Sequence, residues 1–543
     1  MNRPVCHLRA AIRLMLFCAS VGAAEAAWLK AYGPDHDATG FSVRHSPLGD
    51  YHLTGVSNSR EFLAKIDADG RFLWGRRFEA PVRVETAPSN ARPPYQHMFS
   101  VPARRNSQAF AWGKLRVNAK TGAIKKIFSK TMDTAMDGNF VLQAVASPAS
   151  SLHSGYVITG SLNSNWRGGP DVAGGDVAVA KVNAETGALD WSRVLGTDLG
   201  GLKPSSDKVF PLVTQVGGTL YYSFSMSLLD SAAGANPAKL WSFIGKLDAK
   251  TGALVGTPVI FDGVNVSHSS LPDGSVLAYG KALNTATRQL DLVLVKLNKD
   301  LKYEWGKSYA SASGEIMDLS TGGNLTRRSG EIELTGSHFL SLATAENYPV
   351  AVRVGAADGS IVAQKEWRLR AASALDILAP STIKKPVTDF DLMQGSIESA
   401  QPGVRDIVFG KLDADLVTSW VRSIPGAAVS KGAVSSWRLS PNETRGSFRV
   451  WGITSAFGAG GDHLLLGQVD KHGNIPGCSY VQEEATLEIT PDILAREFDF
   501  NALIRAASML HDQGRLPTGV KDYGGVNLRT KTYRLGATAV CGK

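Results

Sequence analysis

The chain has 543 residues, of which 43% are hydrophobic and 20% charged, as in an ordinary globular protein. Its formal net charge is +9, but the basic residues are dispersed along the chain, which argues against nucleic-acid binding. No stretch contains the 18 consecutive apolar residues that a membrane-spanning helix needs. We therefore expect neither a nucleic-acid-binding protein nor a membrane-spanning one.

Residues 1–26 have the pattern of a secretory signal peptide. A basic region (Arg3, Arg9 and Arg13) precedes a short apolar core from Leu14 to Val21, and Ala24-Glu25-Ala26 fits a cleavage site between small residues. Phe17 precedes Cys18 where a lipoprotein signal requires a small residue. The pattern predicts export to the periplasm or the extracellular space, without lipid attachment.

From residue 27 to residue 478 the chain repeats itself eight times. Each copy has a short apolar strand, a basic or polar residue, a turn and then a large apolar residue, as in FLAKIDADGRFLWGRRF from Phe62. The copies lie 50–65 residues apart when aligned on Lys65, Arg116, Lys181, Lys246, Lys296, Arg353, Lys411 and Gln468. A repeat at this period determines the architecture before any other signal is considered.

Each repeat predicts one small antiparallel sheet. Apolar and polar residues alternate on both sides of a glycine-containing turn, which is typical of a hairpin. A linear β-solenoid is the alternative, but its repeats are shorter. Sheets of this size bury both faces when they pack radially, so the sequence predicts an all-β, eight-bladed β-propeller of antiparallel four-stranded blades.

The N-terminal strand is expected to close the ring. Trp28 to Gly33 (WLKAYG) resembles the last strand of other units, whereas the eighth unit lacks such a strand. The N-terminal segment would therefore complete the last blade and leave no open sheet edge.

Residues 479–543 depart from the repeat and are expected to form a small α/β extension. Thr490-Pro491-Asp492 has the pattern of a helix start, and apolar residues follow at helical spacing up to Gly514. This helix is expected to pack on the propeller; a docking helix for a partner is the alternative. Residues 532–541 are predicted to form a strand. Cys478 and Cys541 are the only cysteines outside the signal peptide, and the sequence predicts that they form a disulfide that tethers the extension.

No local motif identifies a catalytic, cofactor-binding or metal site. The eleven histidines are scattered, and Asp35-His36-Asp37 and the Asp67–Gly70 turn are interpreted as loop and turn chemistry. A site assembled from many blades around the central channel would have no spacing signature. The tryptophans at 74, 191, 305, 367 and 420 are interpreted as packing between blades, with an aromatic docking ring as the alternative. Glycosylation sequons occur at Asn265, Asn324 and Asn442.

The segments AKVNAETGALDW (180–191) and GKLDAKTGALVG (245–256) resemble the repeat of pyrroloquinoline-quinone-type propellers. That family includes quinoprotein dehydrogenases and the propeller lipoprotein of the outer-membrane β-barrel assembly machinery. VLVKLNKDLKYEWGKSY (293–309) is similar to the short repeats of secreted bacterial propellers. The resemblance implies the fold alone. Quinoprotein enzymes carry two adjacent cysteines near the cofactor, and this sequence has none, so no cofactor is expected.

The sequence therefore predicts a non-catalytic, monomeric exported propeller that acts as a binding or scaffolding module in the bacterial cell envelope. Its partner would be an envelope or extracellular protein or a polysaccharide. The alternative is an enzyme centred on the channel, either a quinone-dependent oxidoreductase or a carbohydrate- or lactone-acting hydrolase or lyase.

Overall fold

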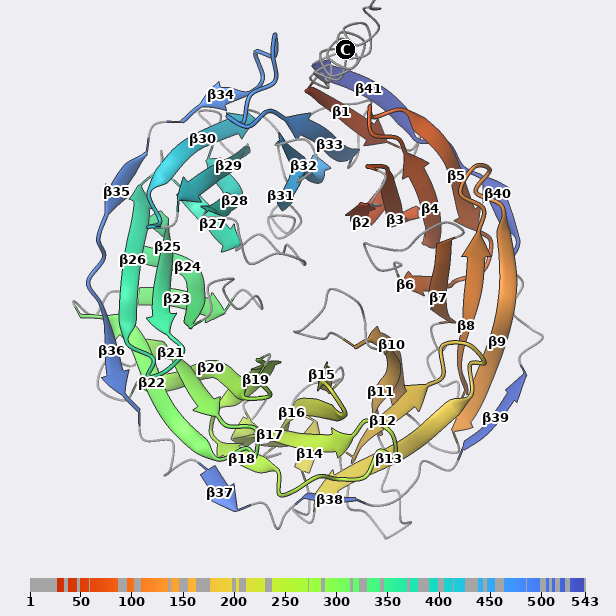
Figure 1. Ribbon diagram of the computed structural model, residues 1–543, viewed down its shortest axis with the longest axis vertical. Coiled ribbons are helices and arrows are strands. Elements are labelled where there is room, and N and C mark those ends of the chain that lie inside the picture. Colours follow the sequence, from red (N-terminus) through yellow and green to blue (C-terminus); the bar gives the residue numbers. More distant parts are fainter. Residues whose placement is uncertain are drawn as a thin grey trace, which may run out of the picture.

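Eight β-sheets stand around a ring in the computed structural model (Figure 1). The structure describes residues 27–33, 38–45, 49–57, 59–85, 95–101, 109–134, 138–145, 155–162, 176–197, 202–204, 211–229, 237–271, 273–284, 289–312, 316–321, 330–341, 346–368, 372–378, 390–398, 405–413, 415–424, 438–442, 447–454, 463–484, 486–498, 504–506, 510–512, 518–522 and 528–541. All the described secondary structure is β-strand, and the pairs are antiparallel, as the sequence predicts.

Blades one to four follow the chain in order from the inner to the outer strand. Blade one comprises β2 (Ala38–His45), β3 (Tyr51–Ser57), β4 (Arg60–Ile66) and β5 (Phe72–Phe78). Blade two comprises β6 (Arg83–Glu85), β7 (Tyr95–Val101), β8 (Ala109–Val117) and β9 (Ile124–Thr134). Blade three comprises β10 (Gly138–Ala144), β11 (Tyr156–Leu162), β12 (Asp176–Val182) and β13 (Leu189–Thr197). In blade four, β14 (Leu202–Pro204) and β15 (Leu212–Val216) both pair with β16 (Thr219–Leu229), which β17 (Pro237–Asp248) and β18 (Val259–Asp262) follow.

Blades five to eight repeat this order. Blade five comprises β19 (Asn265–Ser270), β20 (Val276–Asn284), β21 (Gln289–Leu297) and β22 (Tyr303–Ser311). Blade six comprises β23 (Ile316–Thr321), β24 (Glu331–Ser341), β25 (Glu346–Gly355) and β26 (Ile361–Arg368). Blade seven comprises β27 (Ala372–Leu378), β28 (Phe390–Glu398), β29 (Arg405–Asp413) and β30 (Thr418–Ile424). Blade eight takes β31 (Arg438–Asn442), β32 (Ser447–Thr454) and β33 (His463–Val469) from the end of the repeat region and β1 (Trp28–Gly33) from its start.

Strand β1 closes the ring, which confirms the prediction. It pairs antiparallel with β33 over five residues, from Trp28 opposite Gln468 to Tyr32 opposite Leu464. Five of its six residues are buried. The first and last parts of the repeat region therefore share blade eight. The pairing of β1 with β33 holds the two parts together and closes the ring.

The C-terminal segment forms a belt around the outside of the ring (Figure 1). It adds a fifth, outer strand to each blade, beginning at blade seven, running back to blade one and ending on blade eight. We call residues 482–541 the belt; its strands are β34 (Gln482–Glu483), β35 (Leu487–Ile489), β36 (Ile493–Glu497), β37 (Ile504–Ala506), β38 (Leu510–Asp512), β39 (Thr518–Asp522), β40 (Thr530–Thr532) and β41 (Gly536–Cys541).

The predicted helix after Thr490 is wrong for the described residues. Strands β36, β37 and β38 occupy its span, and each pairs with the outer strand of a different blade. The outer edges of the blades offer unpaired backbone groups, and pairing with them outweighs the local helical spacing of the apolar residues. The strand predicted for residues 532–541 is confirmed by β41.

The hydrophobic core is divided into eight clusters among the described residues, each between two neighbouring blades. The cluster between blades eight and one contains Trp28, Tyr32, Phe62 and Leu464, for example. The remaining clusters follow the ring in the same way. Stability therefore depends on contacts between neighbours, as in other repeat architectures.

Candidate functional site

A β-bulge recurs at one position of the repeat. Lys65 pairs with Trp74 and Ile66 with Phe72, so Leu73 has no partner residue across the ladder. The same shift occurs in five other blades, where the extra residue is Ile127, Asp190, Glu304, Val362 or Ser419. We call these six residues the bulge ring. All six side chains are exposed.

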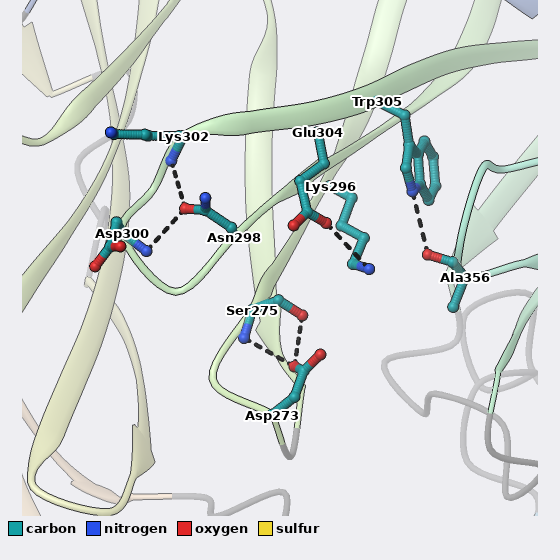
Figure 2. Close-up of polar contacts among 9 residues, drawn as sticks. All are labelled: Asp273, Ser275, Lys296, Asn298, Asp300, Lys302, Glu304, Trp305 and Ala356. Atoms are coloured by element: carbon teal, nitrogen blue, oxygen red, sulfur yellow. Dashed lines mark hydrogen bonds and ion pairs between the residues drawn. The ribbon is translucent and has the colours of Figure 1, made fainter.

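The bulge directs the next side chain toward the neighbouring blade. In blade one the indole Nε1 of Trp74 donates a hydrogen bond to the carbonyl of Ala119 at 3.0 Å, in the turn of blade two. Figure 2 shows the same contact between Trp305 and Ala356 of blade six. Equivalent bonds run from Trp28 to Ala68, from Trp191 to Ala249 and from Trp420 to Lys471. These tryptophans pack between blades, as the sequence predicts.

Trp367 lies at a different position of the repeat. Arg353 pairs with Ala363, so Ala363 occupies the place of the docking tryptophan in blade six. Trp367 comes four residues later on the same strand and is fully buried in the cluster between blades six and seven. It still fills the space between blades, but without the hydrogen bond to the next turn.

The turns that receive the tryptophans are held by their own side chains. Asp67 Oδ1 accepts hydrogen bonds from the amides of Asp69 and Arg71, at 3.0 and 2.7 Å. Asn298 does the same in blade five for the amides of Asp300 and Lys302 (Figure 2). The Asp67–Gly70 segment is therefore turn chemistry, as predicted.

The aligned basic residues also have structural roles. Lys181 Nζ donates to the Ala249 carbonyl at 2.7 Å, and Lys246 Nζ donates to the Lys299 carbonyl at 2.9 Å, each in the turn of the next blade. In blade five, Lys296 instead forms an ion pair with Glu304 of its own blade at 3.1 Å (Figure 2). These side chains therefore hold either the turn of the next blade or a residue of their own blade in place.

The alignment of the second repeat on Arg116 is wrong. The shift in register there falls between Lys114 and Leu115, and Lys114 pairs with Phe128 where other blades pair lysine with tryptophan. Lys114 reaches Glu185 of blade three at 3.1 Å. The run of alternating basic and apolar residues from Lys114 to Arg116 allows both alignments in the sequence.

A buried polar cluster joins blades four and five. His268 Nδ1 lies 2.7 Å from Ser223 Oγ, and His268 Nε2 lies 2.9 Å from Thr214 Oγ1. Thr214 Oγ1 also lies 2.5 Å from Ser270 Oγ. Burial lowers the pKa of His268 to about 3, so the ring is neutral. Ser223 and His268 are both buried, so this pair is a packing contact between the two blades.

Sequence reasoning missed this cluster because its members come from three strands, separated by up to 56 positions. Only the packing of neighbouring inner strands brings them together. Alternation of polar residues in NVSHSS (Asn265–Ser270) is the one local signal, and it is equally typical of an exposed strand.

The other sequence-predicted sites have mixed outcomes. Asn265 begins β19 with an exposed side chain, and Asn442 ends β31. Asn324, Asp35-His36-Asp37 and residues 1–26 lie outside the described residues.

In the part of the chain that is described, no three His, Cys, Asp or Glu side chains gather to hold a metal ion. The described residues also contain no helix that is long and apolar enough to cross a membrane.

The Cys478–Cys541 disulfide is present, as predicted, with 5.3 Å between the Cα atoms. Cys478 follows the last turn of blade eight, and Cys541 ends β41 on the same blade. The chain between them contributes an outer strand to all eight blades. The disulfide therefore closes the belt into a covalent hoop around the propeller.

Side chains of the belt pack into the spaces between blades. The ring centroids of Tyr533 and Phe62 are 4.8 Å apart, and Ile493 and Phe498 contact two different clusters. Glu488, on the outer strand of blade six, accepts a hydrogen bond at 2.6 Å from the Thr418 amide of blade seven and pairs with Lys365. The belt thus connects neighbouring blades as well as covering their edges.

No family model matches the chain, and no curated protein matches it. One similar solved structure is prolyl oligopeptidase B from Galerina marginata, bound to a 35mer hydrolysis and macrocyclization substrate, with 9% identity and a TM-score of 0.37. The match covers 82% of this chain and 55% of that one, so the chain spans about half the length of that protein. Another is the WD40 domain of SCAP from fission yeast, with 10% identity, a TM-score of 0.25, and coverage of 60% and 96%.

Proposed function

We propose that this protein is an exported propeller that acts as a binding or scaffolding module of the bacterial cell envelope. The bulge ring carries the proposal. The backbone bulge fixes the positions of its six residues, whose side chains are exposed to solvent. Two of them contact their own blade: Asp190 accepts a hydrogen bond from Asn183, and Glu304 pairs with Lys296. Loops and exposed positions presented by a rigid scaffold are where proteins place recognition.

The bulge ring varies in chemistry from blade to blade. Leu73, Ile127 and Val362 are aliphatic and expose 47, 40 and 56% of their surface, whereas Asp190 and Glu304 are acidic. Each lies a few residues after the hairpin turn, so the six share one face of the ring. A partner that spans several blades would contact several of these side chains at once, and their pattern would determine whether it binds. An envelope or extracellular protein, or a polysaccharide, would suit a surface on which aliphatic and acidic side chains are spread over several blades.

The proposed compartment follows from the disulfide. Structural disulfides form and persist in oxidising surroundings such as the periplasm and the extracellular space. Residues 1–26, with the pattern of a signal peptide, support the same location. The channel enzyme remains the alternative prediction from the sequence.

The test compares two faces of the ring. The immobilised protein is used to capture binders from envelope extract and polysaccharide fractions, and each binder is purified and titrated against two variants. In the first, Leu73→Ser, Ile127→Ser and Val362→Ser are combined. In the second, Leu283→Ser alters an exposed aliphatic residue at the opposite end of its blade, next to the loop between β20 and β21.

We expect the triple variant to lose at least tenfold in affinity for the captured binder, and Leu283→Ser to bind it as the wild type does. Equal binding by the triple variant would place recognition elsewhere. Conversion of a captured small molecule or polysaccharide would favour the enzyme.

A further inference from the structure

Strand β1 is held between two strands whose ends are covalently joined. Leu29 pairs with Gly467 of β33 on one side and with Cys541 of β41 on the other. Cys478 lies a short loop beyond β33. The Cys478–Cys541 bond therefore links the two flanks of β1 at the end where the N-terminal segment enters the ring.

The outer of these strands has few side-chain contacts of its own. Ala537, Thr538 and Ala539, in the middle of β41, are exposed, and the apolar contact of the strand comes from Val540 and Cys541 at its end. The main attachments of β41 are thus its backbone hydrogen bonds to β1 and the disulfide. Each such hydrogen bond contributes only about 1 kcal/mol net.

The disulfide can be reached from solvent. Both cysteines are half-buried, and the residues on either side of Cys478, Gly477 and Ser479, are exposed. A half-buried disulfide with exposed neighbours is more open to thiol exchange than a fully buried one.

We propose that Cys478–Cys541 is a redox latch that controls β41 without controlling the ring. A dithiol reductant attacks one sulfur, forms a mixed disulfide and is then released as its own disulfide. Two electrons and two protons pass to Cys478 and Cys541, which become thiols. β41 then separates from β1 and leaves the outer edge of blade eight unpaired.

The propeller stays closed when the latch opens, because β1 has a second set of attachments. It pairs with β33, the Trp28 indole donates to the Ala68 carbonyl of blade one, and the Tyr32 hydroxyl donates to the Gly70 carbonyl at 2.6 Å. Trp28 and Tyr32 are both buried in the cluster between blades eight and one. Opening is therefore local to the belt.

Hydrogen exchange of the native full-length chain tests this, with and without a dithiol such as dithiothreitol. Reduction is expected to speed amide exchange at least tenfold in β41 and in the outward-facing amides of β1. The inner strands of all blades are expected to stay protected over the same labelling time, because their amides exchange only through global unfolding. The Cys478→Ser/Cys541→Ser variant should exchange like the reduced wild type whether or not dithiothreitol is present.

Two results would overturn the latch. Unchanged exchange in β41 after complete reduction would show that backbone pairing alone holds the strand. Loss of protection in all blades within that labelling time would show that the disulfide keeps the whole ring closed and does not act locally. Reduced wild-type protein, which folds before reduction, keeps the test valid if the double variant fails to fold.

Discussion

At the residue scale, the turn glycines decide how closely two blades approach. Gly473 has a φ of +77°, and a Cβ added there would lie 2.6 Å from the ring of Trp420. Glycine is the residue that tolerates both the left-handed backbone and a ring against its Cα. The contact between the turn and the tryptophan therefore depends on the absence of a side chain.

We predict that Gly473→Ala lowers the free energy of unfolding by about 2–4 kcal/mol, since it adds a backbone penalty to overpacking against Trp420. Gly256→Ala is the matched control, because its φ is +68° and nothing lies within 4 Å of the added Cβ. It should cost about 1 kcal/mol. Thermal unfolding of both variants is the measurement, and equal losses would mean that the tryptophan contact adds nothing.

Acid sensitivity is a second prediction at this scale. Burial lowers the pKa of His268 from 6.5 to about 3, so the unfolded chain binds a proton that the folded protein excludes. Stability is therefore lost as pH falls below 6.5, by about 3 kcal/mol at pH 4.5. Burial lowers the pKa of His52 to about 3 as well, with the same sign.

Chemical denaturation between pH 7 and pH 4.5 measures this loss. His268→Gln cannot take up the proton, so the variant should lose about 3 kcal/mol less than the wild type over that range. An identical pH dependence in the two proteins would show that His268 does not contribute to it.

Sequence reasoning at the residue scale succeeded where the signal is local. The turn residues, the tryptophans and the cysteine pair are visible as motifs. Lys114, Trp367 and His268 were misplaced or missed, because their roles depend on a bulge or on contacts between strands of different blades.

At the scale of elements, β1 bears on ring closure more than its length suggests. Trp28 packs edge-on against Tyr51 of blade one, with ring centroids 6.0 Å apart, and its indole donates to Ala68. We predict that Trp28→Ala lowers the free energy of unfolding by about 3–5 kcal/mol, since it leaves a cavity between blades eight and one.

Trp28→Phe should lose only about 1 kcal/mol, the net value of the hydrogen bond. Thermal unfolding and sedimentation separate the variants, because loss of closure also exposes sheet edges that associate. A small effect of Trp28→Ala would mean that pairing of β1 with β33 suffices for closure.

Acidic residues attach the first part of the belt unequally. The Glu488 side chain is 20% exposed and accepts a hydrogen bond from the Thr418 amide, whereas the Glu483 side chain is 81% exposed and faces Arg422 at 3.4 Å. The hydrogen bonds from Thr418 and the nearby Lys365 lower the pKa of Glu488 against the opposing effect of burial.

We predict that Glu488→Gln costs about 1–2 kcal/mol and Glu483→Gln less than about 0.5 kcal/mol, as for an exposed ion pair. The loss should be present at pH 7 and fade at acidic pH, where the Glu488 carboxylate of the wild type is itself protonated. Urea unfolding at both pH values provides the comparison. Equal losses of stability in the two variants at pH 7 would show that the contact of Glu488 between blades six and seven stabilises the protein no more than the exposed pair of Glu483 does.

The blades could be predicted element by element, but the belt could not. Alternating residues and turn glycines mark each hairpin in the sequence. The belt strands have two to six residues, too few for a strand pattern, and their partners lie at distant points of the chain. Ile504 and Leu510 lie in the span of the predicted helix, but each pairs with the outer strand of a different blade.

At the scale of the whole molecule, the ring is closed twice, by β1 from within blade eight and by the hoop from outside. The eightfold repeat made the first closure predictable, while the second depends on the path of the belt. Repeat counting gives the number of blades but carries no information on a segment that does not repeat.

The disulfide provides a global prediction. Its sequence separation of 63 corresponds to about 4 kcal/mol of lost chain entropy in the unfolded state. The Cys478→Ser/Cys541→Ser variant should therefore unfold at a lower temperature, as differential scanning calorimetry would detect. A wild-type midpoint that reduction does not shift would contradict the entropic account.

The pairing of the first strand with the last blade also determines when the ring can close as the protein is made. Synthesis proceeds from the N-terminus, so Trp28–Gly33 is made first, long before its partners His463–Val469 and Gly536–Cys541. This apolar strand therefore stays unpaired until nearly the entire polypeptide has followed it. The ring therefore cannot close during synthesis, and the unpaired strand edge needs protection from association until the last residues are made.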